Sequence, residues 1–199
     1  MTTAYYSQTT SRFREDEGDL AGATWLGTGN NQDLERGLDD PFRVRFVIAE
    51  SNNKSAGNVY FKLQYSKNSG TWTDVNAASS NVRPSDSSYV ADDATTIQRI
   101  GSGTYTSGTE CEGFDDVDGM GGHVDLDGNT EAEVEYCITI RSAEASATDV
   151  FDLRVVRWSD PDTIELDSYD QVPTVTVTGG ATTVPGSITA DAVVQKTLS

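Results

Sequence analysis

Acidic side chains crowd the stretch between positions 111 and 129, and they are the residues best suited to chemistry in this sequence. Asp125, Asp127 and Asn129 carry oxygen atoms at alternate positions, beside glycines that let the chain turn. Calcium takes about six to eight oxygen ligands from loops of this kind. The glycine at position 128 and the lack of a predicted flanking helix make a poor EF-hand match. Two interpretations stay open: hydrated loop acids, or a calcium site at Asp125, Asp127 and Asn129.

Patterns that carry catalysis are otherwise missing from the sequence. Glycoside hydrolysis needs two carboxylates across a cleft, but nothing singles out one pair among the 32 acids. The sequence has no Gly-x-Ser-x-Gly motif that would hold a nucleophilic serine. Its only histidine, His123, would have to act as the base for either Cys111 or Cys137. We therefore expect no enzyme and no cofactor apart from the calcium alternative. Whether Cys111 and Cys137 form a bridge stays open.

Three tryptophans offer a different chemistry, because aromatic rings can stack on sugars. Trp72 follows a turn at Ser69-Gly70, directly after an apolar strand, and is expected in the core. Trp158 stands at the end of its strand, next to Ser159-Asp160-Pro161. We expect Trp158 to be exposed, which makes it the candidate for contact with a carbohydrate.

Four segments alternate apolar and polar residues with a period of two, the pattern of β-strands, at 42–48, 59–65, 131–141 and 151–156. Antiparallel sheets commonly bury one strand face and leave the other in water. We therefore expect Arg43, Arg45 and the acids Glu131, Glu133 and Glu135 to face solvent. Arg43 and Arg45 then become candidates for contact with a partner.

Weaker strand candidates lie at 12–15, 23–26, 72–75, 95–100, 164–169, 172–178 and 188–194. Residues 33–38 predict one short helical turn, and no longer window has a helical stripe. Many short strands joined by Gly, Asn and Asp turns predict an all-β fold, an antiparallel β-sandwich with extended terminal arms.

The chain divides into an N-terminal arm (1–10), a β-sandwich domain (11–178) and a C-terminal hinge with a strand-like arm (179–199). The apolar residues of that last arm are Ile188, Ala190, Val193 and Val194. Two interpretations are open for it: a frayed end or edge strand of the same sandwich, or an arm that adds a strand to a neighbouring subunit.

Negative charge is the dominant compositional feature of the 199 residues, which carry a formal net charge of −18. Such a chain repels phosphate backbones and anionic lipids, so we expect neither nucleic acid nor a membrane as partner. The first six residues lack the basic and apolar regions of a secretory signal. Aspartates in turns explain part of the acidity, and a high-salt habitat is the rival explanation.

Several segments of the sequence resemble immunoglobulin-like β-sandwich proteins from structural modules of tailed phages and viruses. They are Phe61–Val75, Arg12–Gly18 with Ala23–Trp25, Val82–Ser87, Glu133–Ile138 and Phe151–Val156. The resemblance implies an immunoglobulin-like or jelly-roll-like sandwich and a non-enzymatic virion component, such as a capsid decoration protein or a tail-associated module. It supplies no catalytic residues.

The resulting expectation is a homo-oligomeric decoration or cement protein on the virion surface, assembled in the host cytoplasm. Its partners would be the major capsid protein or other virion proteins, bound through terminal arms and sheet edges. The alternative is an adhesion or carbohydrate-binding module on a tail fibre or a cell surface.

Overall fold

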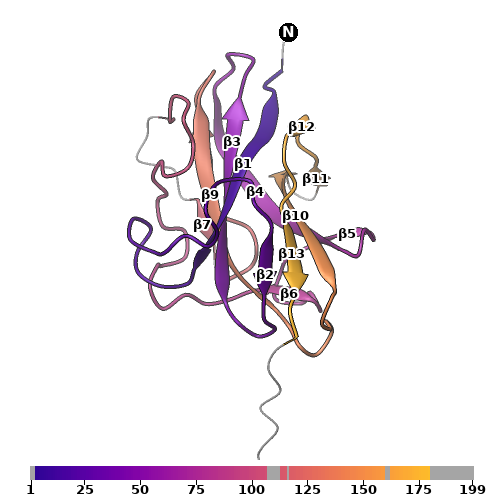
Figure 1. The fold of residues 1–199 in the computed structure, drawn as a ribbon. Coiled ribbons are helices and arrows are strands. Elements are labelled where there is room, and N and C mark those ends of the chain that lie inside the picture. Colours follow the sequence, from indigo (N-terminus) through magenta and orange to yellow (C-terminus); the bar gives the residue numbers. More distant parts are fainter. Residues whose placement is uncertain (1–2, 107–112, 116, 160–161, 180–199) are drawn as a thin grey trace, which may run out of the picture.

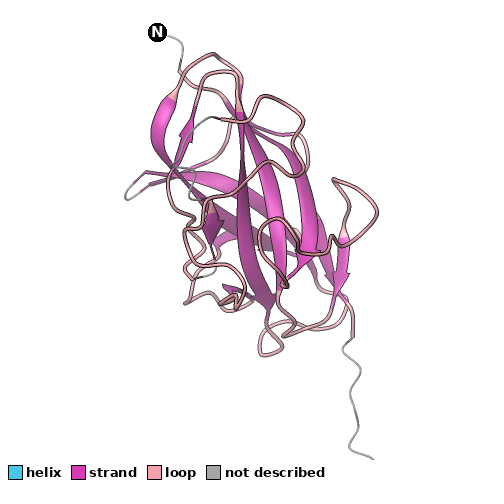
Figure 2. Cartoon of the chain, turned by 90° about the vertical axis from the view of Figure 1, so that its left-hand side faces the viewer, coloured by secondary structure: helices cyan, strands magenta, loops and turns pink. Residues whose placement is uncertain are grey.

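A computed structural model describes residues 3–106, 113–115, 117–159 and 162–179. These residues form strands and no helix, as Figure 2 shows, and thus no helix that is long and apolar enough to cross a bilayer. The strands are β1 (Tyr6–Glu15), β2 (Leu34–Arg36), β3 (Phe42–Glu50), β4 (Ala56–Lys67), β5 (Trp72–Asp74), β6 (Val82–Pro84), β7 (Phe114–Asp115), β8 (Val124–Leu126), β9 (Glu131–Ile140), β10 (Val150–Ser159), β11 (Asp162–Ile164), β12 (Ser168–Tyr169) and β13 (Thr174–Val177).

Two mixed sheets pack face to face as the layers of a β-sandwich (Figure 1). Sheet A has the order β12-β1-β3-β9-β6, with β7 beside β9. Sheet B has the order β2-β13-β10-β4-β5, with β11 beside β10 and β8 beside β4. The long strands pair antiparallel, whereas the short β12, β7 and β2 run parallel to their neighbours. The predicted all-β sandwich is confirmed, and an immunoglobulin-like strand order stays a prediction.

Alternation along the long strands fills the space between the sheets with apolar side chains. Phe42 and Phe46 of β3 meet Phe61 and Phe151 of sheet B in one core, and each is at most 1% exposed. Burying a large apolar side chain contributes about 1.5–3 kcal/mol. The hydroxyl of Tyr136 in sheet A donates to the carbonyl of Phe61 in sheet B (3.0 Å), so this buried hydroxyl has a hydrogen-bond partner.

Several local predictions are wrong because tertiary pairing overrides short-range preference. Residues 33–38 form no helical turn, since Leu34–Arg36 pairs with β13 as β2. The N-terminal arm predicted at 1–10 is not separate from the sandwich, because Tyr6–Thr10 is the start of β1 and pairs with β3. Residues 95–100 contain no strand, and 23–26 contribute only a bridge between Trp25 and Arg14.

The edges of both sheets are short among the described residues. The outermost strands β12, β6, β2 and β5 have two or three residues each, and β6 ends in Pro84, which has no N–H to donate. Short edges of this kind leave little backbone for a further strand to pair with. Partner binding through the sheet edges stays a prediction.

Candidate functional site

The outer face of sheet A, turned away from the core, carries an ionic cluster with no solvent exposure. Its members are Arg14 of β1, Arg43 and Arg45 of β3, and Glu133 and Glu135 of β9, all 0% exposed. They alternate along their strands with the core residues, so the period-two pattern places them correctly on this face. The predicted solvent exposure is wrong for all five residues, because loops cover the face: Arg43, Arg45, Glu131, Glu133 and Glu135.

Ion pairs link the cluster across the three strands. Arg45 donates through Nη1 to Oε2 of Glu133 (2.9 Å) and through Nε to Glu135. Glu135 also pairs with Arg14 (3.3 Å) and with Arg43 (3.7 Å), so one carboxylate serves three guanidinium groups. Burial lowers the pKa of Arg14 to about 10, with Glu135 opposing the change. Burial also acts against the charge of Arg45, but Glu135 and Glu133 outweigh it and raise its pKa.

The cluster fixes a first covering loop, residues 16–25. Arg43 donates to the carboxylate of Asp16 (2.8 Å) and to the carbonyl of Gly18 (3.0 Å). Arg14 donates to the carbonyls of Asp19 (3.1 Å) and Leu20 (3.0 Å). A loop without regular structure is thereby held against the sheet by charge-assisted hydrogen bonds.

A second covering loop, residues 86–101, is held in the same way. One carboxylate oxygen of Glu133, Oε1, accepts three backbone N–H bonds, from Arg99 (2.8 Å), Ile100 (2.7 Å) and Gly101 (2.8 Å). Arg45 donates to the carbonyl of Ile97 (2.9 Å). Both loops therefore have positions that are set by the buried charges beneath them.

Between these two loops lies an open pocket of about 370 Å³, here called the loop pocket. Apolar side chains from both loops supply most of its lining: Leu20, Ala21, Tyr89, Val90, Ala94 and Ile97. Tyr89 is 55% exposed and Ile97 is 43% exposed, unusual values for large apolar side chains at one spot. The arrangement presents a fixed apolar surface to solvent.

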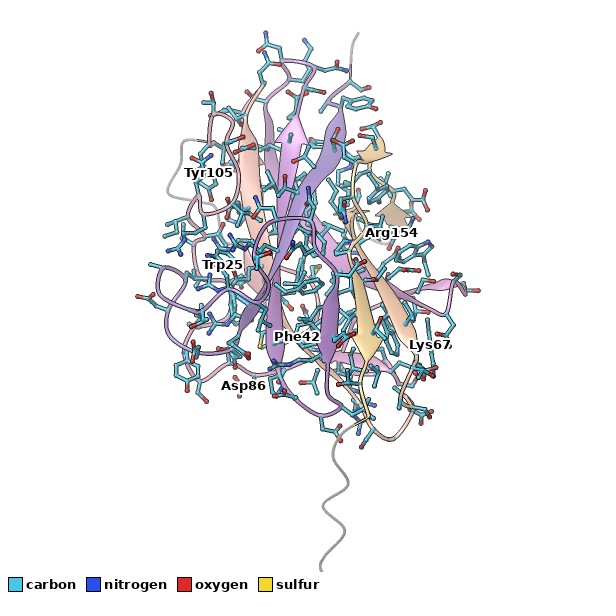
Figure 3. All side chains as sticks on the ribbon, in the orientation of Figure 1. Trp25, Phe42, Lys67, Asp86, Tyr105 and Arg154 are labelled. Atoms are coloured by element: carbon cyan, nitrogen blue, oxygen red, sulfur yellow. The ribbon has the colours of Figure 1, made fainter. Side chains whose placement is uncertain are left out.

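A basic rim, formed by Arg12, Arg14 and Arg99 around Trp25, adjoins the loop pocket; Figure 3 labels Trp25. The guanidinium carbons of Arg12 and Arg14 each lie 4.7 Å from the centroid of the Trp25 ring, and that of Arg99 lies 5.7 Å away. Arg99 also donates to the carbonyl of Ala21, a lining residue of the pocket. Positive charge thus gathers beside the apolar surface, in a protein whose net charge is −18.

Sequence reasoning missed Tyr89, Ile97 and the two covering loops, because neither loop has periodic hydrophobicity. It also placed the partner contact at Arg43 and Arg45, which are buried and hold the loops instead. A signal for the cluster was present, since β3 carries arginines and β9 carries glutamates at alternate positions. Arg45 and Glu135 stand directly opposite each other in the antiparallel register.

Trp158, which was expected to be exposed, is half-buried near the end of β10 in sheet B. Its ring lies edge-on to Tyr60, with centroids 5.8 Å apart, and 5.2 Å from the ammonium nitrogen of Lys62. The residue also lines a second pocket, of about 260 Å³, together with Tyr6 and Arg157. An aromatic group beside polar side chains is compatible with sugar contact, and Trp158 as a carbohydrate-binding residue stays a prediction.

The residues proposed for calcium lie in β8 and in the turn after it, and they contact the end of β3, the turn after β3 and the start of β4. Asp125 accepts the backbone N–H of Asn58 (2.7 Å), and Asp127 accepts the hydroxyl of Ser55 (3.3 Å). The backbone N–H of Asn129 donates to Glu50 (2.9 Å). Among the described residues, no group of three or more His, Cys, Asp or Glu side chains is placed to hold a metal ion. The calcium site at Asp125, Asp127 and Asn129 stays a prediction.

Asp115, in the parallel strand β7, is a buried acid outside the ionic cluster. It is 1% exposed, and its Oδ1 accepts the backbone N–H of Gly119 (2.8 Å). Burial and the neighbouring carboxyl of Asp118 raise the pKa of Asp115 to about 8. Asp115 therefore holds a proton near neutral pH.

The remaining predicted contacts, Ile188, Ala190, Val193 and Val194, lie outside the described residues, as does Cys111. Cys137 is buried in β9.

No protein-family model and no curated protein matches the sequence. Among solved structures, the chain is similar to a family 123 glycoside hydrolase from Clostridium perfringens, with 8% identity and a TM-score of 0.38. The match covers 86% of this chain and 28% of the chain of that hydrolase. Similarity this low carries no conclusion about the activity of the present protein.

Proposed function

We propose that this protein is a non-enzymatic structural protein of a virus particle, a decoration protein on the outside of a tailed-virus head. In this role it binds the major capsid protein or other virion proteins and forms homo-oligomers. The observation that carries the proposal is the loop pocket, whose exposed Tyr89 and Ile97 stand on covering loops fixed from below. Exposed apolar surface of this kind marks interaction sites.

The two covering loops are held in place beneath the pocket, which favours a role of the pocket in binding. Binding costs less when the contacting groups are ordered beforehand, because fewer rotations are lost on association. The hydrogen bonds of Arg14, Arg43 and Arg45 provide that order for the two loops. The short edge strands also make side-chain contact a better mode of association than strand addition to the sandwich.

The charge of the protein supports an external position on the particle. A net charge of −18 keeps the chain away from packaged nucleic acid and prevents particles from adhering to one another. Together with the sequence resemblance to virion modules, these properties favour a capsid coat over an intracellular enzyme.

Antibody labelling of purified particles of the virus that encodes the chain tests this proposal. We expect the antibody to decorate intact heads, and Tyr89→Asp to lower the occupancy of the protein on particles at least about tenfold. Tyr5→Asp is the matched control, because Tyr5 is also an exposed tyrosine (36%) but does not line the loop pocket. Absence of the chain from purified particles would overturn the proposal.

A carbohydrate-binding role is the second candidate, and the contacts of Trp158 favour it. The edge-on contact with Tyr60 and the nearby Lys62 make an aromatic and polar surface beside the second pocket. A glycan array separates the two functions. Saturable sugar binding that is lost in Trp158→Ala and retained in Tyr89→Ala would support this second role.

A further inference from the structure

The loop pocket and its basic rim together define the chemistry of what binds there. The pocket accepts apolar side chains, through Leu20, Tyr89 and Ile97. Beside it, neither Arg12 nor Arg99 forms an ion pair with a carboxylate of the described residues, and Nε of Arg12 is buried without a hydrogen-bond partner. A suitable occupant therefore combines apolar side chains with a carboxylate a few residues away.

Acidic residues also lie near the pocket. Asp19 lines the pocket, but its Oδ1 accepts the N–H groups of Ala21 (2.9 Å) and Gly22 (2.7 Å) within its own loop. Asp92 and Asp93 lie on the 86–101 loop, between the lining residues Val90 and Ala94. The surroundings of the pocket thus carry both signs of charge, with the positive side at Trp25.

A segment with the required chemistry occurs in the chain itself, outside the described residues. Residues 188–194 read Ile-Thr-Ala-Asp-Ala-Val-Val, which places Asp191 between apolar side chains, and Lys196 follows. Eight residues, 180–187, separate this segment from Gly179, and a chain of that length spans up to about 28 Å. That is enough to reach an adjacent molecule.

We propose that residues 188–194 of one copy dock in the loop pocket of a second copy. In an extended segment Ile188 and Val194 lie on one face and contact Tyr89 and Ile97, while Asp191, on the other face, pairs with Arg99 beside the pocket. The inference rests on the proposed structural role and specifies how copies contact each other. A second copy is favoured over the same copy because β13, which leads into the segment, belongs to sheet B, whereas the pocket covers the outer face of sheet A. Such a head-to-tail contact between two different surfaces forms a closed ring of copies when the rotation from one copy to the next is a whole fraction of a turn.

Sedimentation of the full chain over a range of concentrations tests the pocket. We expect reversible association that Ile97→Asp weakens at least about tenfold, because a charge then replaces a central apolar contact. Ile164→Asp is the matched control: Ile164 is 38% exposed and lies outside the loop pocket. Thermal unfolding of both variants shows whether they are folded. A wild-type chain that stays monomeric at all concentrations overturns the inference, as does association that Ile97→Asp leaves unchanged.

A charge exchange tests the pairing of Asp191 with Arg99. Asp191→Arg and Arg99→Glu should each weaken association about tenfold, and the two changes combined should restore most of it. A synthetic peptide of residues 186–199, added to full-length Val194→Asp, should bind that variant and should not bind when Ile97→Asp is also present. Peptide binding without concentration-dependent association of the wild type would mean docking within one copy and would overturn the contact between copies. Particle labelling is independent of these measurements, so failure of the docking and failure of the virion role are distinguishable.

Discussion

The outer faces of the two sheets carry similar alternating charges but place them in different environments. On sheet A, Arg45 and Glu135 are both 0% exposed beneath the covering loops. On sheet B, the side chain of Arg154 is also only 10% exposed, but its partner Glu165 (2.7 Å) is 67% exposed. In Figure 3, Trp25 marks the side of the covered face and Arg154 the opposite side.

This difference in solvent exposure indicates that the surroundings of an ion pair decide how much it contributes to stability. Arginines and glutamates under a loop layer need every partner they have, because a buried charge without a partner costs several kcal/mol. An exposed carboxylate such as that of Glu165 is hydrated and screened, so the ion pair that it forms contributes little. The face under the loops builds a fixed surface above it, and the open face does not.

The largest expected effect comes from removing the shared carboxylate of the covered face. Glu135→Ala leaves Arg14, Arg43 and Arg45 in a buried site with excess positive charge, and we expect a loss of about 3–5 kcal/mol in the free energy of unfolding. Urea denaturation measures this loss. Limited proteolysis should also find the 86–101 loop more accessible, since Arg45 then loses its orienting partner.

A small effect of Glu135→Ala would contradict the assigned role of the covering layer. Glu135→Gln keeps the shape and removes the charge, so it should fall between the wild type and the alanine variant.

The second prediction concerns the acid Asp115, beside the ionic cluster. Its pKa of about 8 in the folded state lies above the ordinary aspartate value of 3.8, so near neutral pH the folded protein keeps this proton while the unfolded chain loses it. This group therefore makes its full contribution to stability below about pH 4, and that contribution falls as the pH rises to about 8.

Asp115→Asn removes that dependence, because the amide mimics the protonated acid and can still accept the N–H of Gly119. We expect the advantage of the variant over the wild type in the free energy of unfolding to grow as the pH rises from 5 to 8. Chemical denaturation at several pH values measures the difference. A difference that stays constant from pH 4 to pH 9 would show that Asp115 is ionised in the folded protein.

Much of the fold follows from the sequence, and the candidate site does not. Alternation located β3, β4, β9 and β10, because an apolar residue at every second position needs a core on one side only. The pattern says nothing of what covers the other side, so Arg45 and Glu133 were expected in water. The covering loops have no period, and their positions depend on contacts such as Arg43 with Gly18, which are distant in sequence.

Trp72 shows the same limit on the open face. It was predicted in the core, yet it pairs with Ser66 on the outer face and its ring lies 4.2 Å from the guanidinium carbon of Arg154. Trp72→Ala should cost about 1 kcal/mol through loss of this cation–π contact. Urea denaturation measures it, and Trp72→Phe should retain part of the contact. A loss as large as that of Glu135→Ala would mean that the open face is as dependent on its contacts as the covered one.

The smallest expected effect is that of Glu165→Ala, the counterpart on the open face of Glu135→Ala. Arg154 keeps its other contacts when Glu165 is removed, since it donates to Gln64 (3.0 Å) and lies over the Trp72 ring. The exposed carboxylate is already hydrated, so we expect a change below about 0.5 kcal/mol that disappears in high salt. Glu165→Ala combined with Glu135→Ala should be additive, because the two sites lie on opposite sheets and share no partner. If the single change cost as much as Glu135→Ala, burial would not be what separates the two faces.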